Sequence, residues 1–238
     1  MLGGKLMIVP NLIISPQDIL GSRITSFMTT KLLEKEFSEL NDGEILNKDF
    51  LQNLINIPII WMNQEHGNVA LEVSKRDIKK TVNADALYSK ESGLAIAVVS
   101  ADCLPVILSD KNGSEIAAIH AGWRGLVDGI IESTLELFMG KLDNISAWLA
   151  PCISLSNFEV GQDVFSRFEA RGLAQFCIYE PLKNKWYLDL QGAAREVLER
   201  YGLTVQASNS CTFDQNHLFH SYRKNKTLNR MVTLIWKD

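Results

Sequence analysis

Several short segments in the middle of the chain are almost continuously apolar. Residues 94–99 and 104–108 are the clearest, and residues 115–119 continue the pattern after a polar turn. A strand that is covered on both faces carries apolar side chains on both, so these runs predict buried strands. The other strands that we expect are shorter, and they lie at residues 57–62, 145–149, 205–207 and 231–236.

Segments with helical spacing of apolar residues alternate with these runs. The helices predicted by this spacing cover residues 123–138, 160–171 and 189–201. Gly140 and Gly202 are expected to end the first and the last of them. Residues 31–56 also show the spacing of amphipathic helices, interrupted by a polar turn at Asn41-Asp42-Gly43.

Strands and helices mixed along one chain predict an α/β or α+β domain with a mixed sheet. No linker, repeat or low-complexity run divides the 238 residues. We therefore expect a single domain over residues 1–238.

Composition and charge exclude several classes of function. The chain is 46% hydrophobic and 22% charged, with a net charge of -4, which predicts no binding to nucleic acid. Near the N-terminus, Pro10, Asn11, Pro16 and Asp18 interrupt the apolar residues, so we expect neither a signal peptide nor a membrane span. The four cysteines form no CxxC pair and are expected to be reduced thiols in a cytoplasmic protein.

Three reactive side chains lie where predicted strands end. His66 follows the run at 57–62, Cys103 lies between two buried strands, and His120 lies at a strand–helix junction. Strand-end loops on a rigid scaffold commonly carry functional groups. Two imidazoles and a thiolate suit Zn²⁺ or copper, and three protein ligands leave a fourth tetrahedral position for water. The three residues are therefore candidate ligands of one catalytic metal ion.

The residue types alone leave other interpretations open. A cysteine between apolar strands is usually a core residue, and a lone histidine at a strand end is usually structural. Cys103 and His120 could also form a nucleophile pair, with Cys103 as thiolate and His120 as base. The spacings of 37 and 17 residues between the three candidates do not match a zinc finger.

Two strings are specific enough to indicate a family. Ala101-Asp-Cys-Leu-Pro-Val106, followed by His120-Ala-Gly-Trp-Arg-Gly125, resembles the bacterial YfiH/YlmD family. This family is also called the laccase-domain or multicopper-polyphenol-oxidase-like family, and its members are called peptidoglycan editing factors. Shorter motifs of the family follow in order at 64–67, 84–86, 158–161, 211–212, 221–223 and 234–236.

The resemblance implies an α+β fold of mixed, buried sheets flanked by helices in layers. It also implies that His66, Cys103 and His120 are the ligands of a zinc ion, with copper as the other metal to consider. The implied activity is zinc-dependent phosphorolysis of adenosine, inosine, guanosine and methylthioadenosine, with deamination of adenosine. The implied partners are a purine nucleoside and phosphate, with no nucleic acid and no membrane.

Two further residues join Cys103 and His120 in the candidate catalytic set. Arg223 is our candidate for the phosphate contact, because a guanidinium binds phosphate bidentately. Asp102 precedes Cys103 and is expected either to orient a ligand or a water, or to cap a turn.

Residues around the second string have simpler expected roles. Gly122 and Gly125 are expected to permit a tight backbone at a helix start, where free N–H groups can bind an anion. We expect Trp123 to be a core residue, and we assign Arg124 no partner. His217 and His220 are left out of the metal set.

The chain departs from the family pattern in two places. Residues 27–31, Phe-Met-Thr-Thr-Lys, stand where the family has F-x-S-T-R and then a glycine-rich loop. Lys31 cannot reproduce a bidentate arginine contact, and we expect a more open pocket there. Leu228-Asn-Arg230 stands in place of the usual T-G-R.

Three other functions deserve comparison. Copper-dependent oxidation of polyphenols is disfavoured, because a set of several coppers needs more than the four histidines present. Peptidoglycan editing predicts hydrolysis of a muramyl–amino-acid precursor, with Cys103 as nucleophile. A non-catalytic nucleotide sensor would use the same pocket without chemistry.

Overall fold

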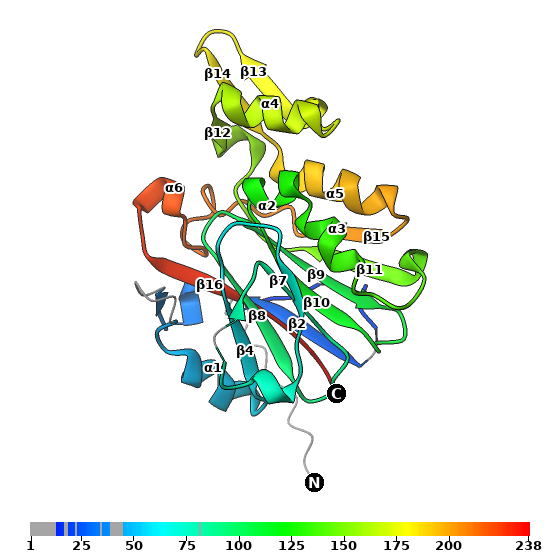
Figure 1. Ribbon diagram of the computed structural model, residues 1–238. Helices are drawn as coiled ribbons and strands as arrows, with labels where there is room; N and C mark the ends of the chain where they lie inside the picture. The colour runs from blue at the N-terminus through cyan, green and yellow to red at the C-terminus, as the bar shows by residue number, and fades with distance from the viewer. Residues whose placement is uncertain (1–12, 17–18, 22, 34, 39–44, 81) are drawn as a thin grey trace.

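The computed structural model describes residues 13–16, 19–21, 23–33, 35–38, 45–80 and 82–238. The turn at Asn41-Asp42-Gly43 and three of the interrupting residues near the N-terminus, Pro10, Asn11 and Asp18, lie outside these ranges. Two large mixed sheets and one small sheet make up the fold (Figure 1), which confirms the predicted α+β class with mixed, buried sheets.

The first sheet contains the C-terminal strand near its centre. Its order is β1 (Ile13–Ile14), β2 (Ile24–Thr29), β16 (Asn229–Lys237), β8 (Ala95–Ser100), β4 (Ile59–Asn63) and β6 (Val82–Asn83), and β3 (Phe37–Ser38) pairs with the start of β16.

The second sheet carries most of the helices. Its order is β15 (Thr204–Ala207), β11 (Ile145–Leu149), β9 (Leu104–Asp110), β10 (Ile116–Ala121), β7 (Ala86–Ser89) and β5 (Ala70–Glu72). The third sheet has the order β12 (Glu159–Val160), β14 (Lys185–Leu188) and β13 (Cys177–Glu180).

The helices are short. The α-helices are α1 (Lys48–Ile55), α2 (Trp123–Asp128), α3 (Ile130–Leu135), α4 (Gln162–Ala170), α5 (Leu190–Arg200) and α6 (Tyr222–Asn225). The 3-10 helices are η1 (Lys31–Leu33), η2 (Lys75–Asp77), η3 (Leu142–Asn144), η4 (Leu155–Asn157) and η5 (Ala174–Phe176). Within the described ranges, no helix has the length and apolar character that crossing a bilayer requires.

Strand alternation explains the layers. In β8, Ile96 and Val98 belong to the core between the two large sheets, whereas Ala97 belongs to the core on the α1 side. In β10, Ala118 faces the core between the sheets and Ile119 packs on the side of α2, α3 and α5. Both large sheets are therefore covered on two faces, as their continuous apolar runs predict.

The prediction of one helix over residues 123–138 is wrong in one respect, because two helices form there. Gly129 has a φ of 90°, a left-handed conformation that glycine adopts without steric cost, and it separates α2 from α3. The helix predicted from residue 160 begins at Gln162, since Val160 belongs to β12.

The helical interpretation is also wrong for residues 31–33 and 35–38, the part of this segment that the structure describes. Lys31–Leu33 form only one 3-10 turn, and Phe37–Ser38 form a strand. Phe37 is buried in the core on the α1 side and pairs with Arg230 of β16, so tertiary pairing overrides the local helical spacing. Of the helix predicted from residue 44 onward, Lys48–Ile55 is helical.

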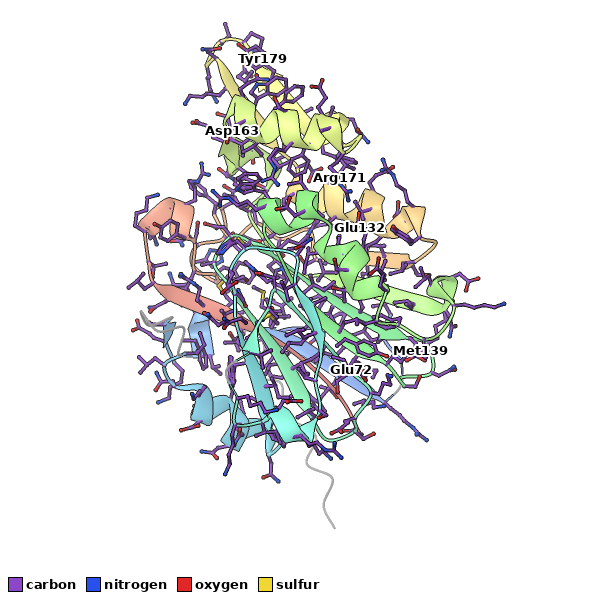
Figure 2. All side chains as sticks on the ribbon, in the orientation of Figure 1. Glu72, Glu132, Met139, Asp163, Arg171 and Tyr179 are labelled. Atoms are coloured by element: carbon purple, nitrogen blue, oxygen red, sulfur yellow. The ribbon has the colours of Figure 1, made fainter. Side chains whose placement is uncertain are left out.

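The third sheet and α4 form a lobe of residues 159–188 that projects from the body (Figure 1). Two ion pairs join it to the body, one between Arg167 and Asp128 and the other between Arg171 and Glu132. Figure 2 labels Arg171 and Glu132 where the lobe adjoins the body. The β13–β14 hairpin was absent from the predicted elements.

Candidate functional site

Strand register places His120 opposite Asp85 at one end of the core between the sheets. His120 continues the alternation of Ile116 and Ala118, so its imidazole faces the space between the two sheets. Its backbone N–H donates to the Asp85 carbonyl at 2.7 Å, and its Nδ1 lies 2.8 Å from Asp85 Oδ1. Because a carboxylate only accepts, Nδ1 carries the proton and Nε2 is left free to bind a cation.

The same carboxylate holds the loop that carries His66. Asp85 accepts the backbone N–H groups of His66 at 2.9 Å, Gly67 at 2.7 Å and Glu65 at 3.2 Å. Burial would raise the pKa of Asp85, but the hydrogen bond from His120 and those from the backbone outweigh it and lower that pKa. Asp85, only 1% exposed, therefore orients two of the three candidate metal ligands.

The third residue completes a compact set of donor atoms. One nitrogen from each of His66 and His120 and the sulfur of Cys103 all lie within 4.8 Å of one another. A tetrahedral zinc with bonds of about 2.0 to 2.3 Å holds its ligand atoms about 3.3 to 3.8 Å apart. Donor types and spacing therefore both fit a metal ion of the zinc or copper class.

The buried thiol and imidazole change each other's acidity. Burial would raise the pKa of Cys103, but the charge of His120 and hydrogen bonds from both histidines outweigh it and lower the pKa to about 6. Burial would lower the pKa of His120, but the Cys103 thiolate and Asp85 raise it to about 9. Even without a metal, the site therefore favours a thiolate at neutral pH.

Two glycines let the backbone approach this cluster, as the sequence predicts. A Cβ at Gly122 would lie 3.3 Å from both Cys103 Sγ and His66 Cδ2. A Cβ at Gly125 would lie 2.5 Å from the Gly67 carbonyl oxygen, closer than atoms can pack. Gly125 is therefore required for α2 to pack against the His66 loop.

The three donors open into a cavity of about 480 Å³, here called the sheet-edge cavity. It is lined by Gln64, His66, Val99, Ser100, Ala101, Asp102, Cys103, His120, Trp123, Arg124, Ile153, Phe158, Leu190, Tyr222, Arg223 and Arg230. Aromatic faces and three arginines thus share one cavity with the donor cluster.

Two of the arginines lie over aromatic rings. Arg223 lies 5.5 Å from the centre of the Phe158 ring, and its Nη1 donates to the Glu159 carbonyl at 2.9 Å. Arg124, which had no partner in the sequence-based interpretation, lies 4.6 Å from the centre of the Trp123 ring. Trp123 packs partly against the core, as predicted, but it also lines the cavity. Such stacking holds a guanidinium while leaving its N–H groups directed at a ligand.

Asp102 connects Cys103 to the segment that carries Arg223. Its carboxylate accepts the Thr212 hydroxyl and the Arg223 backbone N–H, both at 2.7 Å. Its φ of 99° is rare for a residue with a side chain. Both carboxylate oxygens are engaged, so the contacts fit a residue that positions Arg223 beside the donor cluster.

Two positioning residues were missed by the sequence reasoning. Asp85 lies within the family motif at residues 84–86, and an acidic residue between two alanines beside an apolar strand is a usable signal for such a role. Gln64 pairs its side-chain amide with both backbone groups of Val99, at 2.9 Å each, and so ties the His66 loop to β8.

Of the remaining residues considered in the sequence, one lines the sheet-edge cavity and three lie outside the cavity or the donor cluster. Lys31 donates its Nζ to the Asn216 carbonyl at 2.9 Å and is not among the residues that line the cavity. Arg230, in the departing Leu228-Asn-Arg230 segment, does line it. His217 and His220 lie outside the donor cluster.

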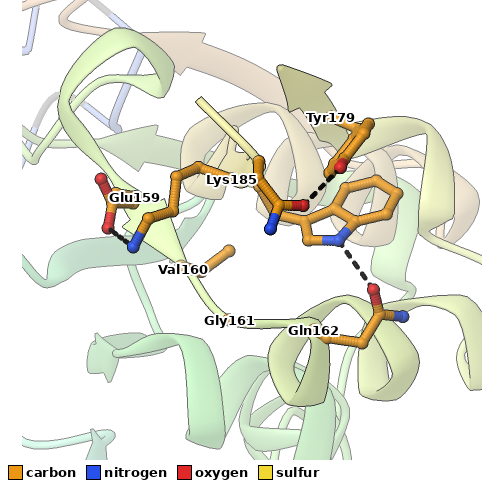
Figure 3. Close-up of a pocket in the computed structure, with 8 residues that line it drawn as sticks. Glu159, Val160, Gly161, Gln162, Tyr179 and Lys185 are labelled. Atoms are coloured by element: carbon orange, nitrogen blue, oxygen red, sulfur yellow. Dashed lines mark hydrogen bonds and ion pairs between the residues drawn. The ribbon is translucent and has the colours of Figure 1, made fainter. Parts of the chain in front are cut away.

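A second cavity, here called the lobe cavity, adjoins β12 on the lobe and encloses about 530 Å³. Its polar side chains pair with one another (Figure 3). Lys185 and Glu159 form an ion pair at 2.8 Å, and Trp186 donates to Gln162 at 2.8 Å. Phe158 lines the sheet-edge cavity and the next residue, Glu159 of β12, lines the lobe cavity.

Comparison with known proteins gives consistent relatives. The sequence model of the family described as multi-copper polyphenol oxidoreductase laccase matches residues 45–238. The purine nucleoside phosphorylase YfiH of Shigella flexneri is 38% identical over 185 residues, which cover 77% of this chain and 75% of that protein. A purine nucleoside phosphorylase of Xylella fastidiosa (strain Temecula1) is 34% identical over 200 residues, covering 80% of this chain and 77% of its own.

Solved structures agree with the fold. The Neisseria meningitidis protein NMB0706 superposes with a TM-score of 0.86 at 29% identity, over 95% of this chain and 99% of that one. A Bacillus licheniformis hypothetical protein YfiH has the same fold, with a TM-score of 0.85 at 20% identity, over 96% of this chain and 97% of its own. The chain therefore belongs to the YfiH family of laccase-like domains.

Proposed function

We propose that this protein is a purine nucleoside phosphorylase that acts in the sheet-edge cavity. One observation carries the proposal: three metal-donor atoms within 4.8 Å of one another share a cavity with two arginines that lie over aromatic rings. The names of relatives that are 34% to 38% identical over about three quarters of the chain support the same reaction. The cavity is large enough for a nucleoside and its co-substrate, since ligand pockets commonly enclose about 300 to 1,000 Å³.

We further propose that His66, Cys103 and His120 hold one zinc ion, with Asp85 orienting the His120 imidazole and the loop that carries His66. The donor set also suits copper, so metal availability decides which ion is bound. When bound, the ion supplies a Lewis acid that polarises a substrate atom. That all four cysteines are free thiols is consistent with a reducing compartment, and we propose a cytoplasmic location.

The arginines are proposed to bind phosphate. Arg223 lies against Phe158, and its backbone is fixed by Asp102. Arg124 offers a second guanidinium on Trp123. In the reaction a phosphate oxygen bonds to C1′ of the ribose while the C1′–N9 bond breaks, and the purine leaves with the electron pair. Guanidiniums on the phosphate keep its charge bound while positive charge develops on the sugar.

The proposed substrates are adenosine, inosine, guanosine and methylthioadenosine, and hydrolytic deamination of adenosine is proposed for the same site. The test is to load the purified protein with Zn²⁺ and to follow adenosine by chromatography with and without phosphate. Adenine that appears only with phosphate supports phosphorolysis, and inosine formed without phosphate supports deamination. If no base and no inosine form under either condition, the proposal is wrong.

A second candidate has a specific observation in its favour. The lowered pKa of Cys103 beside His120 also suits a cysteine nucleophile with a histidine base, as a hydrolase of a muramyl–amino-acid precursor would need. The Cys103→Ser variant separates the two. A hydrolase loses covalent labelling by a thiol reagent but keeps any metal, whereas the zinc enzyme loses the metal.

Oxidation of polyphenols by several coppers lacks the ligands it needs. The chain has four histidines, and within the described residues His217 and His220 join no cluster of metal donors. Phenol oxidation by copper-loaded protein that persists when free copper is removed from the buffer, and is lost when copper is removed from the protein, would revive this alternative.

A further inference from the structure

The hydroxyl of Ser100 is a buried polar group with no hydrogen-bond partner within the described part of the protein. Ser100 is 3% exposed and lies at the end of β8, where it lines the sheet-edge cavity. Buried side-chain polar atoms are paired in the large majority of cases, so an unpaired one beside a cavity indicates a partner that comes from outside the protein.

The direction of the side chain follows from strand alternation. Ile96 and Val98 of β8 face the core between the two large sheets, and Ser100 continues this series. His120 faces the same space from the opposite sheet. The serine hydroxyl and the imidazole therefore approach one end of the cavity from its two sides.

The polar side chains of Gln64 and Arg230, which line the cavity near Ser100, already have hydrogen-bond partners. Both atoms of the Gln64 amide are bonded to the backbone of Val99. Arg230 precedes Met231, the cross-strand partner of Ser100, and its Nη1 donates to the Thr227 and Asn229 carbonyls at 3.1 and 3.3 Å. The guanidiniums of Arg124 and Arg223 lie instead over the aromatic rings of Trp123 and Phe158.

We propose that the Ser100 hydroxyl hydrogen-bonds the purine nucleoside and is a specificity residue of the site. This inference rests on the proposed phosphorylase function. The hydroxyl is an uncharged group that suits the uncharged nucleoside, while the guanidiniums of Arg124 and Arg223 suit the phosphate dianion. A hydroxyl can rotate to donate or to accept, so one serine accommodates either a 6-amino or a 6-oxo purine.

The test compares Ser100→Ala with Ser109→Ala, a matched control. Ser109 is also a buried serine with an unpaired hydroxyl, 0% exposed, but it lies at the far end of β9 and does not line the cavity. Nucleoside affinity is measured by calorimetry, the KM for nucleoside and for phosphate by kinetics, and metal content by elemental analysis.

We expect Ser100→Ala to weaken nucleoside binding about 2- to 13-fold, the range of one lost hydrogen bond. The phosphate KM, the metal content and the melting temperature should stay unchanged, because removing an unpaired hydroxyl leaves no partner unsatisfied. Ser100→Thr keeps the hydroxyl and should recover part of the affinity, and Ser109→Ala should match the wild type.

Two results would overturn the inference while leaving the phosphorylase proposal intact. One is a Ser100→Ala variant with wild-type nucleoside affinity, and the other is a change confined to the phosphate KM. If the wild type itself neither binds nor cleaves a nucleoside, the proposed function and this inference both fail, and the wild-type measurement shows it directly.

Discussion

The two cavities, lined in part by the consecutive residues Phe158 and Glu159, are similar in size but differ in their chemistry. The lobe cavity encloses about 530 Å³ and the sheet-edge cavity about 480 Å³. In the lobe cavity, Lys185 pairs with Glu159 and Trp186 with Gln162. In the sheet-edge cavity, three donor atoms converge and the Ser100 hydroxyl has no partner in the described structure.

The difference shows that volume does not identify a functional cavity. Polar groups that satisfy one another give a ligand little to bind, because each contact must replace an existing one. Within the described residues, the unpaired Ser100 hydroxyl and the shifted pKa values of Cys103 and His120 distinguish the sheet-edge cavity instead. The following predictions test this contrast, from the largest expected effect to the smallest.

The acidity of Cys103 should differ about a thousandfold from that of an ordinary thiol. In metal-free protein we expect thiolate to form with a midpoint near pH 6, against an ordinary value of 9.0, because of His120 and His66. The measurement is the difference in ultraviolet thiolate absorbance between the wild type and Cys103→Ser. A midpoint near pH 9 would contradict the geometry.

The same shifts set how stability depends on pH. The pKa of Cys103 is lower in the folded protein than in the unfolded chain, so the thiolate stabilises the fold. This contribution to the free energy of unfolding is fully present above pH 9 and is lost as the pH falls toward 6. The pKa of His120 is raised from 6.5 to about 9, so its contribution is complete below pH 6.5 and is lost as the pH rises through 9. The two slopes oppose each other between pH 6.5 and 9. We therefore expect the two groups together to change the metal-free melting temperature little across this range, which thermal melts at a series of pH values measure.

Asp85→Asn should weaken metal binding about 10- to 100-fold, the usual effect of losing the residue that orients a metal-bound histidine. An amide at this position replaces one accepting oxygen with a donor, although Asp85 accepts from His120 and from backbone N–H groups of the His66 loop. Metal affinity is measured by competition with a chelator. Asp77→Asn, at the 3-10 helix η2, is the control and should bind metal normally. Equal affinity in both variants would show that Asp85 does not orient the histidines.

Arg223→Lys should raise the phosphate KM about tenfold and change the nucleoside KM little. Lysine keeps the charge but loses the planar pair of donors and their stacking on Phe158. Steady-state kinetics with each substrate varied in turn measures the effect. Arg171→Lys, at the ion pair between the lobe and Glu132, provides the matched control. A larger change in nucleoside KM than in phosphate KM would assign Arg223 to the nucleoside.

Lys185→Ala in the lobe cavity should leave both KM values and kcat within about twofold of the wild type. The side chains of the Lys185–Glu159 pair are 49% and 42% exposed, and exposed ion pairs contribute little. The same kinetic assay tests it. A loss comparable to that of Arg223→Lys would show that the lobe cavity takes part in the reaction.

How much of this could be predicted from sequence depends on the range of the interactions. The buried strands were predictable because a run such as Ala95–Ser100 needs no partner to reveal that both its faces are covered. Phe37–Ser38 was not, since its strand exists only through pairing with Asn229 and Arg230, almost 200 residues away. The hairpin formed by Cys177–Glu180 and Lys185–Leu188 is short and half exposed, which leaves little periodic signal.

The candidate site shows the same division. His66, Cys103 and His120 were identifiable from residue chemistry and strand ends, but their convergence depends on how the two sheets pack. The role of Asp85 depends on its cross-strand pairing with His120, and the position of Arg223 depends on Asp102 binding a backbone 121 residues away. Sequence thus indicated which groups could react, and tertiary structure determined which groups hold them.

Metal content tests the central claim most directly, because it distinguishes a metal centre from a Cys–His nucleophile pair. Elemental analysis is applied to the wild type, to His66→Ala, Cys103→Ser and His120→Ala, and to Ser109→Ala as a control outside the cavity. We predict about one zinc or copper per chain in the wild type and in Ser109→Ala, and close to none in the three ligand variants. A Cys103→Ser variant that keeps a full equivalent of metal but loses covalent labelling would contradict the account.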